Sequence, residues 1–284
     1  MATYEAEAAP IVVRDPSERT AAKISRAVAK TPLHIFLAFV ALLWLMPTLG
    51  LFLTSLLSPG DFASNGWWKI ISKPHLATWA NYGNVWHNTD IPTAIRITAE
   101  IAIGGTFLPI IIAALAGYAF AWVEFPGRDW LFVAVIAMLV VPLQMALIPI
   151  FSLYNKLGIF DTVLSLVLFH TAFGLPKDIL ESARIDGANE FVIFVRLILP
   201  LGLPAIASLA IFQFLWTWND LIVALTFGQN VQPITVWIFG QLREFGTSID
   251  VIAPASFISL VIPLAVFFAF QRYFVQGLLA GSVK

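Results

Sequence analysis

The segment from Lys177 to Pro204 concentrates ionisable side chains inside a chain that is otherwise very apolar. Its charged residues are Lys177, Asp178, Glu181, Arg184, Asp186, Glu190 and Arg196. Each charge would cost roughly a few kcal/mol at the centre of a bilayer, so we expect the segment to lie outside the hydrocarbon. Outside the hydrocarbon, such a segment is either an amphipathic connector between two membrane helices or a surface that another protein binds.

The spacing of residues in this segment predicts a helix, a turn and a second helix. Residues 178–186 are helix formers, and Gly187 follows as the residue type that most readily ends a helix in a left-handed turn. Apolar residues then return at helical spacing, at Phe191, Phe194, Val195 and Ile198. Pro200 is expected to close the second helix.

Residue patterns typical of enzymes and cofactor sites are missing from the sequence. There is no Ser-His-Asp or paired-carboxylate constellation with convincing spacing, and the four histidines are too scattered for a metal site. The absence of cysteine excludes disulfides and Cys-based zinc sites. Without a G-x-x-x-x-G-K-[ST] loop the chain cannot bind ATP in the P-loop manner. We therefore predict no catalytic residue, no metal and no cofactor in this chain.

Composition places the chain among polytopic membrane proteins. Of its 284 residues, 59% are hydrophobic and 12% are charged, and the mean hydropathy is +0.86. Soluble domains have roughly 45 to 50% apolar and about 25% charged residues. The predicted fold is all-α, and the net charge of -1 gives no electrostatic reason to expect nucleic acid as a partner.

About six apolar segments could cross the membrane as helices. They are residues 31–57, 95–123, 130–151, 162–176, 205–227 and 251–270. The fourth offers a helix of roughly 22 Å, shorter than the hydrocarbon thickness. Either the bilayer thins there, or residues of the natural chain are missing from this sequence. The predicted domains are an N-terminal tail, 1–31, and a transmembrane domain, 32–284, with a polar loop at 177–204 and a C-terminal tail at 271–284.

Basic residues indicate the orientation of the chain in the membrane. Most of the 16 Lys and Arg residues fall in the N-terminal tail, the 124–129 turn, the polar loop and the C-terminal tail. By the positive-inside rule these segments are cytoplasmic, so both termini are predicted to lie inside. The polar start of the chain does not resemble a cleaved signal peptide.

A few polar residues fall within the expected spans and are candidates for a solute path. They are Gln144 in the third span and the run Trp218, Asn219 and Asp220 in the fifth. An intramembrane carboxylate is by default a functional-site hypothesis. Asp220 either borders such a path or caps a broken helix, and both interpretations stay open.

The loop between the first two spans, residues 58–92, is rich in turn formers and tryptophans. Its aromatic residues include Trp67, Trp68, Trp79 and Trp86. Tryptophan prefers the membrane interface, so these rings are expected to contact lipid headgroups. Stacking on a sugar is the alternative, and the sequence does not separate the two.

The polar loop resembles the signature loop of inner-membrane permease subunits of ABC importers, which reads E-A-A, three residues, G, nine residues, I, one residue, L-P. Here Glu181, Ser182 and Ala183 precede Gly187 by that spacing, and Leu197, Leu199 and Pro200 follow. Ser182 and Leu197 depart conservatively from the pattern. The Pro-Gly turn at 126–127, the W-N-D run and the tail QRYFVQGLLAGSVK are similar to those of the maltose-type carbohydrate uptake family.

The resemblance implies the shorter six-span partner of an ATP-driven carbohydrate importer in the inner membrane. It implies a second homologous permease, a cytoplasmic ATPase dimer that binds ATP and Mg, and an extracytoplasmic solute-binding protein, with membrane lipid around the chain. The residues expected to couple to the ATPase are Glu181, Ser182, Ala183, Asp186, Gly187, Leu199 and Pro200, and the tail would touch the ATPase through Gln276 and Gly277. A permease for an amino acid or peptide, or a secondary transporter, is the alternative.

Overall fold

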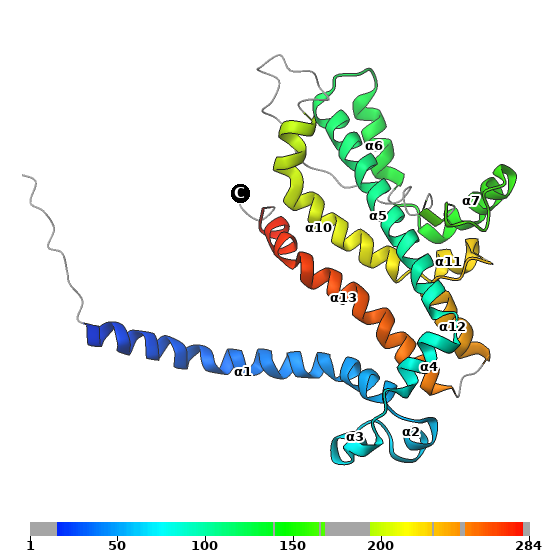
Figure 1. The fold of residues 1–284 in the computed structure, drawn as a ribbon. Coiled ribbons are helices and arrows are strands. Elements are labelled where there is room, and N and C mark those ends of the chain that lie inside the picture. Colours follow the sequence, from blue (N-terminus) through cyan, green and yellow to red (C-terminus); the bar gives the residue numbers. More distant parts are fainter. Residues whose placement is uncertain are drawn as a thin grey trace, which may run out of the picture. The chain divides into compact units, whose positions relative to one another are not determined.

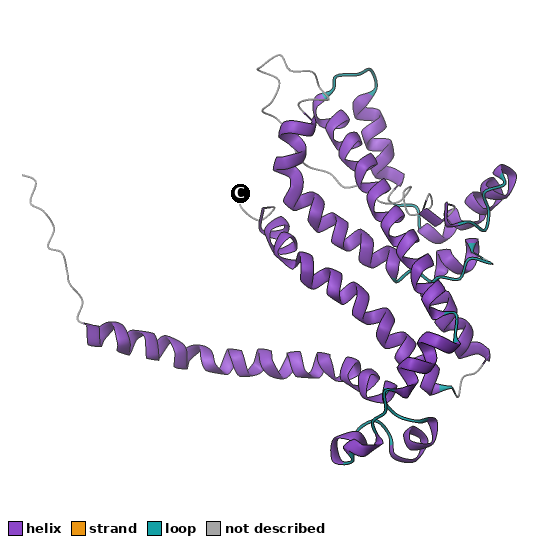
Figure 2. Cartoon of the chain, viewed as in Figure 1, coloured by secondary structure: helices purple, strands orange, loops and turns teal. Residues whose placement is uncertain are grey.

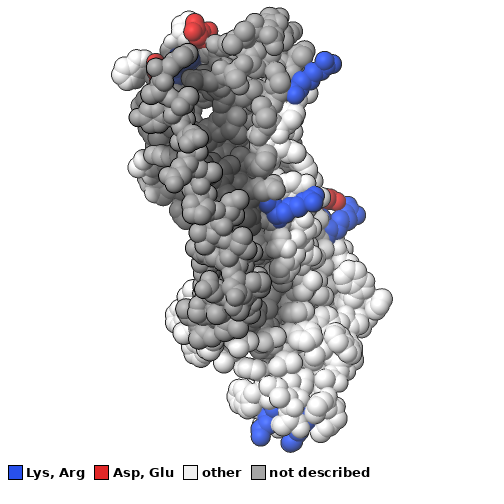
Figure 3. Space-filling model, turned by 90° about the vertical axis from the view of Figure 1, so that its left-hand side faces the viewer, with Lys and Arg blue, Asp and Glu red and all other residues white. Residues whose placement is uncertain are grey.

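The computed structural model describes residues 16–138, 140–164, 166–167, 194–228, 230–244 and 248–280. Every regular element in these ranges is a helix, as the all-α prediction requires (Figure 2). The chain divides into two compact units, Met1–Gly50 and Leu51–Lys284. On the face drawn in Figure 3, few charged side chains are seen among the described residues, in keeping with the apolar composition.

The helices differ widely in length. Those of the first half are α1 (Pro16–Ser55), α2 (Pro59–Asn65), α3 (Lys69–Ser72), the 3-10 helix η1 (Pro74–Leu76), α4 (Ala80–Asn88), α5 (Ile91–Trp122), α6 (Arg128–Met138) and α7 (Leu143–Leu157). The later ones are the π-helical turn η3 (Phe194–Ile198), α10 (Leu199–Trp218), α11 (Ile222–Phe227), α12 (Ile234–Glu244) and α13 (Ile249–Ala280) (Figure 1). Short helices therefore fill the turn-rich loop between α1 and α5.

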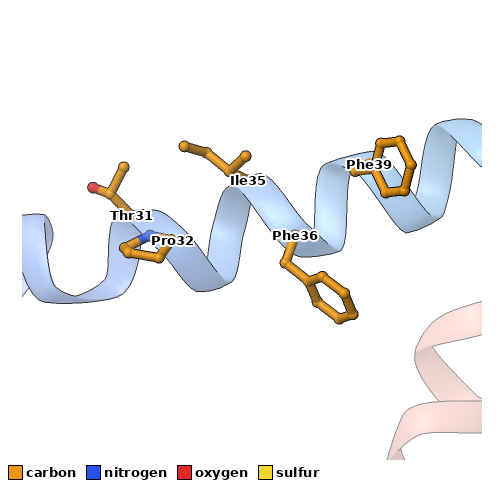
Figure 4. A pocket seen from close by; sticks show the side chains of 5 residues that line it. All are labelled: Thr31, Pro32, Ile35, Phe36 and Phe39. Atoms are coloured by element: carbon orange, nitrogen blue, oxygen red, sulfur yellow. The ribbon is translucent and has the colours of Figure 1, made fainter.

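The first unit consists of most of helix α1. The helix is apolar enough to cross a membrane from Thr31 to Ser55, and large apolar side chains are exposed along it. Figure 4 shows a shallow hollow on this helix, lined by Thr31, Pro32, Ile35, Phe36 and Phe39. Because all five belong to one helix, the hollow is a stretch of helix surface that lipid can cover.

The second unit is built around α10, which packs along both α5 and α13 (Figure 1). One buried cluster joins α4, α5, α12 and α13 through Val85, Ile91, Ala94, Ile234, Trp237 and Ala255. Another joins α5, α7 and α11 through Ile101, Tyr154, Leu166, Val223, Ala224 and Phe227. Lipid is as apolar as these side chains, so close packing and hydrogen bonds hold the membrane part together.

Helices long and apolar enough to span a membrane are found at three places in the described chain. They are Thr31–Ser55, Ile91–Phe120 and Ile249–Tyr273, and they correspond to the first, second and sixth expected spans. The fourth expected span, residues 162–176, is described only at 162–164 and 166–167. Its remainder, and the question of its length, lie outside the described residues.

The third expected span is divided, so the prediction of one continuous helix over residues 130–151 is wrong. Helix α6 ends at Met138 and α7 begins at Leu143, with Pro142 in an extended conformation (φ -60, ψ 134) at the start of α7. Proline lacks a backbone N–H and disfavours helical geometry in the residue before it. Helix α7 then continues to Leu157, beyond the expected end of the span at residue 151.

The fifth expected span is also divided, and it begins earlier than predicted. The turn η3 runs directly into α10 at Leu199, so Pro200 lies in the first turn of a helix instead of closing one. Proline is well tolerated there because the first N–H groups of a helix have no intrahelical partner. Helix α10 ends at Trp218, and α11 starts at Ile222.

Candidate functional site

Asp220 caps the short helix that follows the break in the fifth expected span. Its Oδ2 accepts from the backbone N of Ala224 at 3.0 Å, and its Oδ1 accepts from the N of Val223 at 3.4 Å. The carbonyl oxygen of Asp220 accepts from the Thr235 hydroxyl at 2.7 Å. A carboxylate at a helix N-terminus satisfies free N–H groups and meets the positive end of the helix dipole. Capping, one of the two interpretations of Asp220, is therefore observed; a role in a solute path stays a prediction.

Trp218 and Asn219, the neighbours of Asp220, lie in different surroundings. Trp218 is 1% exposed, and its Nε1 donates to the carbonyl oxygen of Ser259 in α13 at 3.0 Å. Asn219 is exposed, and its Nδ2 donates to the carbonyl oxygen of Leu215 at 2.8 Å. Within this chain, Asn219 is thus open to a solute or a partner, whereas the Trp218 ring serves contact between helices.

The cavity beside Asp220 is too small for a solute. Its volume is about 10 Å³, and it is lined by Thr98, Ile101, Leu166, Thr217, Trp218, Asp220, Ala224 and Pro233. A single water molecule needs about this much space. Among the described residues, a larger solute would therefore lie on an open face of the chain, where a second subunit could complete its path.

Gln144 lies at such an open face. It is exposed in the first turn of α7, just after the break at Pro142. Within the membrane, irregular backbone is tolerated only where it is buried in protein or lines a cavity that contains water. The break beside Gln144 is therefore compatible with the predicted solute path.

Two residues with structural roles were missed in the sequence, Gln213 and Thr98. Gln213 Nε2 of α10 donates to the Gly105 carbonyl oxygen of α5 at 3.0 Å. The Thr98 hydroxyl donates to the Ala94 carbonyl oxygen and accepts from the backbone N of Ile234, both at 2.7 Å. A polar residue inside an apolar helical run was the available signal for both.

The residues expected to couple to an ATPase are described only in part. Glu181, Ser182, Ala183, Asp186 and Gly187 lie outside the described residues. Leu199 and Pro200 open α10, which places that end of the polar loop at the head of a central helix. Gln276 and Gly277 belong to the last turns of α13, so the expected tail is helical at these positions.

An ion pair lies near the N-terminal end of α5. Arg96 Nε lies 2.8 Å from Glu100 Oε1, one helical turn away on α5. Both side chains are largely exposed, so the pair contributes little to stability. The predicted turn before the third expected span is also observed, with Gly127 at φ 81.

The loop between α1 and α4 packs on the end of α1 through a polar contact. Asn81 Nδ2 donates to the carbonyl oxygens of Ser55 and Leu57, each at 2.9 Å. Ser55 Oγ and Tyr82 Oη are 2.6 Å apart. Burial raises the pKa of the Tyr82 phenol above its ordinary value, and the hydrogen bond with Ser55 partly offsets this.

The tryptophans of this loop divide into packing and exposed residues. Trp67 packs on the buried cluster of Leu56, Leu57 and Ile70, whereas Trp68 is 57% exposed. Gly66 has φ 71, and a Cβ there would come within 2.6 Å of the Trp68 ring. Gly66 thus allows the positive φ of the turn, and its lack of a Cβ leaves room for the Trp68 ring.

A comparison with protein families gives a match over most of the second unit. The family described as "Binding-protein-dependent transport system inner membrane component" matches residues 105–279. This range includes the polar loop, the W-N-D run and most of α13.

Curated relatives match most of the chain. It is 44% identical over 275 residues to the osmoprotective compounds uptake permease protein GgtD of Synechocystis, covering 90% of this chain and 92% of GgtD. It is 46% identical over 233 residues to the alpha-glucoside transport system permease protein AglG of Rhizobium meliloti, covering 74% of this chain and 61% of AglG. The trehalose transport system permease protein SugB of Mycobacterium tuberculosis is 30% identical over 84% of this chain and 92% of SugB.

A solved structure has the same fold. One chain of a bacterial ABC transporter involved in the import of the acidic polysaccharide alginate superposes with a TM-score of 0.63. The match covers 92% of this chain and 99% of the other, at 19% identity. At this identity the likeness extends to the fold alone.

Proposed function

The chain belongs to the family of inner membrane components of binding-protein-dependent transport systems, and on this basis we propose that it forms the solute path of an ATP-driven carbohydrate importer. It is a multi-pass membrane protein and a transport permease, not an enzyme. The proposed solute is an oligosaccharide or a glucoside. A second, homologous permease supplies the other half of the path, and an extracytoplasmic binding protein delivers the solute.

The observation that carries this proposal is the high identity to relatives named for such solutes. AglG is named for alpha-glucosides and is 46% identical in the aligned region, while SugB is named for trehalose. GgtD is named for osmoprotective compounds, a wider class. Gln144 and Asn219 are each exposed in this chain, and exposed amides can hydrogen-bond to the hydroxyl groups of such solutes.

The energy for transport comes, in this proposal, from ATP and Mg bound to a cytoplasmic ATPase dimer. The polar loop docks into a groove of that ATPase, with Glu181 and Asp186 contacting basic groups and Gly187 allowing the turn. Helix α10 starts at Leu199, within the C-terminal part of this loop, so movement of the loop would reach the centre of the second unit first. Both termini lie in the cytoplasm, where the tail residues Gln276 and Gly277 can reach the ATPase.

The transport function is tested with the whole complex in proteoliposomes. We expect ATP-dependent uptake of at least one of radiolabelled trehalose, maltose and sucrose, and no uptake of a labelled amino acid or dipeptide. Uptake of the amino acid or dipeptide alone would overturn the carbohydrate assignment. Uptake that continues without the ATPase subunits would indicate a secondary transporter.

The coupling role of the polar loop is tested by substitution within it. Glu181→Lys and Gly187→Pro are expected to lower uptake and solute-stimulated ATP hydrolysis while the permease remains folded in the membrane. Lys177→Gln, in the same loop but outside the signature, is the matched control. Full activity of both signature variants would contradict the coupling role.

A further inference from the structure

Helix α5 contains a proline that leaves one backbone carbonyl without its usual donor. Pro109 lies inside the helix and has no N–H, so the carbonyl oxygen of Gly105, four residues earlier, cannot form its intrahelical hydrogen bond. The side chain of Gln213 in α10 supplies the missing donor, with Nε2 3.0 Å from that oxygen. In a membrane span no water is at hand to take this place.

Helix α13 has the same arrangement at a second proline. Pro263 lies inside α13 and leaves the carbonyl oxygen of Ser259 without an intrahelical donor. Trp218 of α10 donates to that oxygen through Nε1 at 3.0 Å. The Trp218 side chain is 1% exposed, so its position is closely determined by packing.

Both donors belong to α10, the helix that lies along α5 and α13 (Figure 1). A side chain that only filled space between helices would not need to donate a hydrogen bond to the carbonyl oxygen that a proline leaves without a donor. Here that coincidence occurs on two different helices. A helix that lacks one hydrogen bond bends more easily at that point, and in each case the bond that replaces it comes from α10.

We propose that Gln213 and Trp218 are positioning residues that tie α5 and α13 to α10, so that the three helices move as one body when α10 is displaced. This inference rests on the proposed function, because α10 begins in the C-terminal part of the loop expected to dock on the ATPase. When α10 is displaced at Leu199, the segments of α5 and α13 around their prolines then move together with it. If either hydrogen bond is lost, the neighbouring helix no longer moves fully with α10. ATP hydrolysis then continues, but less solute is transported per ATP.

A double-mutant cycle tests the α5 contact specifically. Gln213→Leu removes the side-chain donor. Pro109→Ala restores a backbone N–H at position 109, which can donate to the carbonyl oxygen of Gly105. With the complete transporter in proteoliposomes, we expect Gln213→Leu to lower the amount of solute moved per ATP hydrolysed by about fivefold, the effect of one hydrogen bond. The same substitution in the Pro109→Ala background should have little effect.

The α13 contact has a parallel cycle, in which Trp218→Phe removes Nε1 and Pro263→Ala restores the N–H. Labelled trehalose, maltose and sucrose are supplied together, so that the readout does not depend on which of them is the solute.

Because the chain has no cysteine, spin labels at Ile111→Cys in α5 and Phe212→Cys in α10 provide a readout that needs no solute. Their separation should stay constant between the nucleotide-free and vanadate-trapped complexes, and change in Gln213→Leu.

Two results would overturn the inference. One is an equal loss from Gln213→Leu with and without Pro109→Ala, which would assign Gln213 to packing or to solute contact. The other is an unchanged transport ratio and label separation in Gln213→Leu. Failure of the proposed function is a separate result, because the unsubstituted complex would then move none of the three sugars.

Discussion

Asp161 and Asn230, 69 residues apart, are joined through both oxygens of the Asp161 carboxylate. Oδ1 accepts from the backbone N of Asn230 at 2.8 Å and from the N of Val231 at 3.4 Å, and Oδ2 accepts from Asn230 Nδ2. Asp161 has φ 58, a left-handed conformation that Asp and Asn tolerate better than other side chains. The contact connects the chain after α7 to the turn between α11 and α12.

Substitutions at Asp161 should separate the hydrogen bonds from the backbone conformation. Asp161→Asn keeps an acceptor and tolerates the positive φ, so we expect a change below roughly 1 kcal/mol in the free energy of unfolding. Asp161→Ala loses every acceptor and adds backbone strain, and should cost roughly 1 to 3 kcal/mol. Thermal unfolding of the purified protein measures both. Equal midpoints for the two variants would contradict this role of the carboxylate.

A matched pair of threonines tests hydrogen bonding inside the helix assembly. The Thr106 hydroxyl is buried and has no hydrogen-bond partner among the described residues, whereas the Thr98 hydroxyl makes two. Thr106→Val should therefore leave stability unchanged or raise it by about 1 kcal/mol. Thr98→Val should lower stability by about 1 to 3 kcal/mol, because the N–H of Ile234 loses its acceptor. A larger loss of stability in Thr106→Val than in Thr98→Val would contradict the conclusion that the Thr98 hydroxyl, and not that of Thr106, makes stabilising hydrogen bonds.

Tyr82 should make stability depend on alkaline pH. Its pKa in the fold is raised by burial, so the neutral phenol is favoured over the phenolate when the protein is folded. The corresponding stabilisation is fully present below the unfolded pKa of about 10. It is lost as the pH rises through the higher folded value. Unfolding midpoints from pH 8 to 11 should fall more steeply for the native chain than for Tyr82→Phe, and parallel curves would count against this.

The exposed face of α3 should lie in the interface of the membrane. Ile70 is buried against Leu56 and Leu57 at the end of α1, so α3 contacts the end of a membrane span. Its other side exposes Trp68 and Ile71, with Lys69 beside them. Tryptophan and lysine are typical of this boundary. Lipid contact is therefore expected here in preference to sugar stacking.

A spin label on this face can test the expectation. In nanodiscs, a label at Ile71→Cys should collide more with oxygen than with a water-soluble nickel complex. A label at Ser64→Cys, an exposed position in α2, should show the reverse. Nickel access at position 71 equal to that at 64 would rule out the interface. In addition, Trp68→Ala should leave solute affinity unchanged, and a tenfold loss would favour sugar stacking.

Much of the architecture could be predicted from local patterns. Apolar runs of sufficient length located the helices that contain Thr31–Ser55, Ile91–Phe120 and Ile249–Tyr273. Arg96 and Glu100 stand four residues apart, the spacing at which an ion pair forms on a helix. The break in the third expected span was not predicted, although Pro142 marks it, and the break in the fifth was one of two open interpretations of Asp220. The sequence permits a kink or a complete break at a residue such as Pro142, and local patterns do not decide between them.

By itself the sequence determined the membrane class, the family and three of the segments able to span, since these depend on composition and on spacing along one chain. Only the tertiary structure decided that Gln213 meets Gly105, that Trp218 meets Ser259 and that Asp220 caps α11. The reason is physical. A proline shows which carbonyl is left free, but the donor that satisfies it depends on which helix packs alongside, and at what rotation.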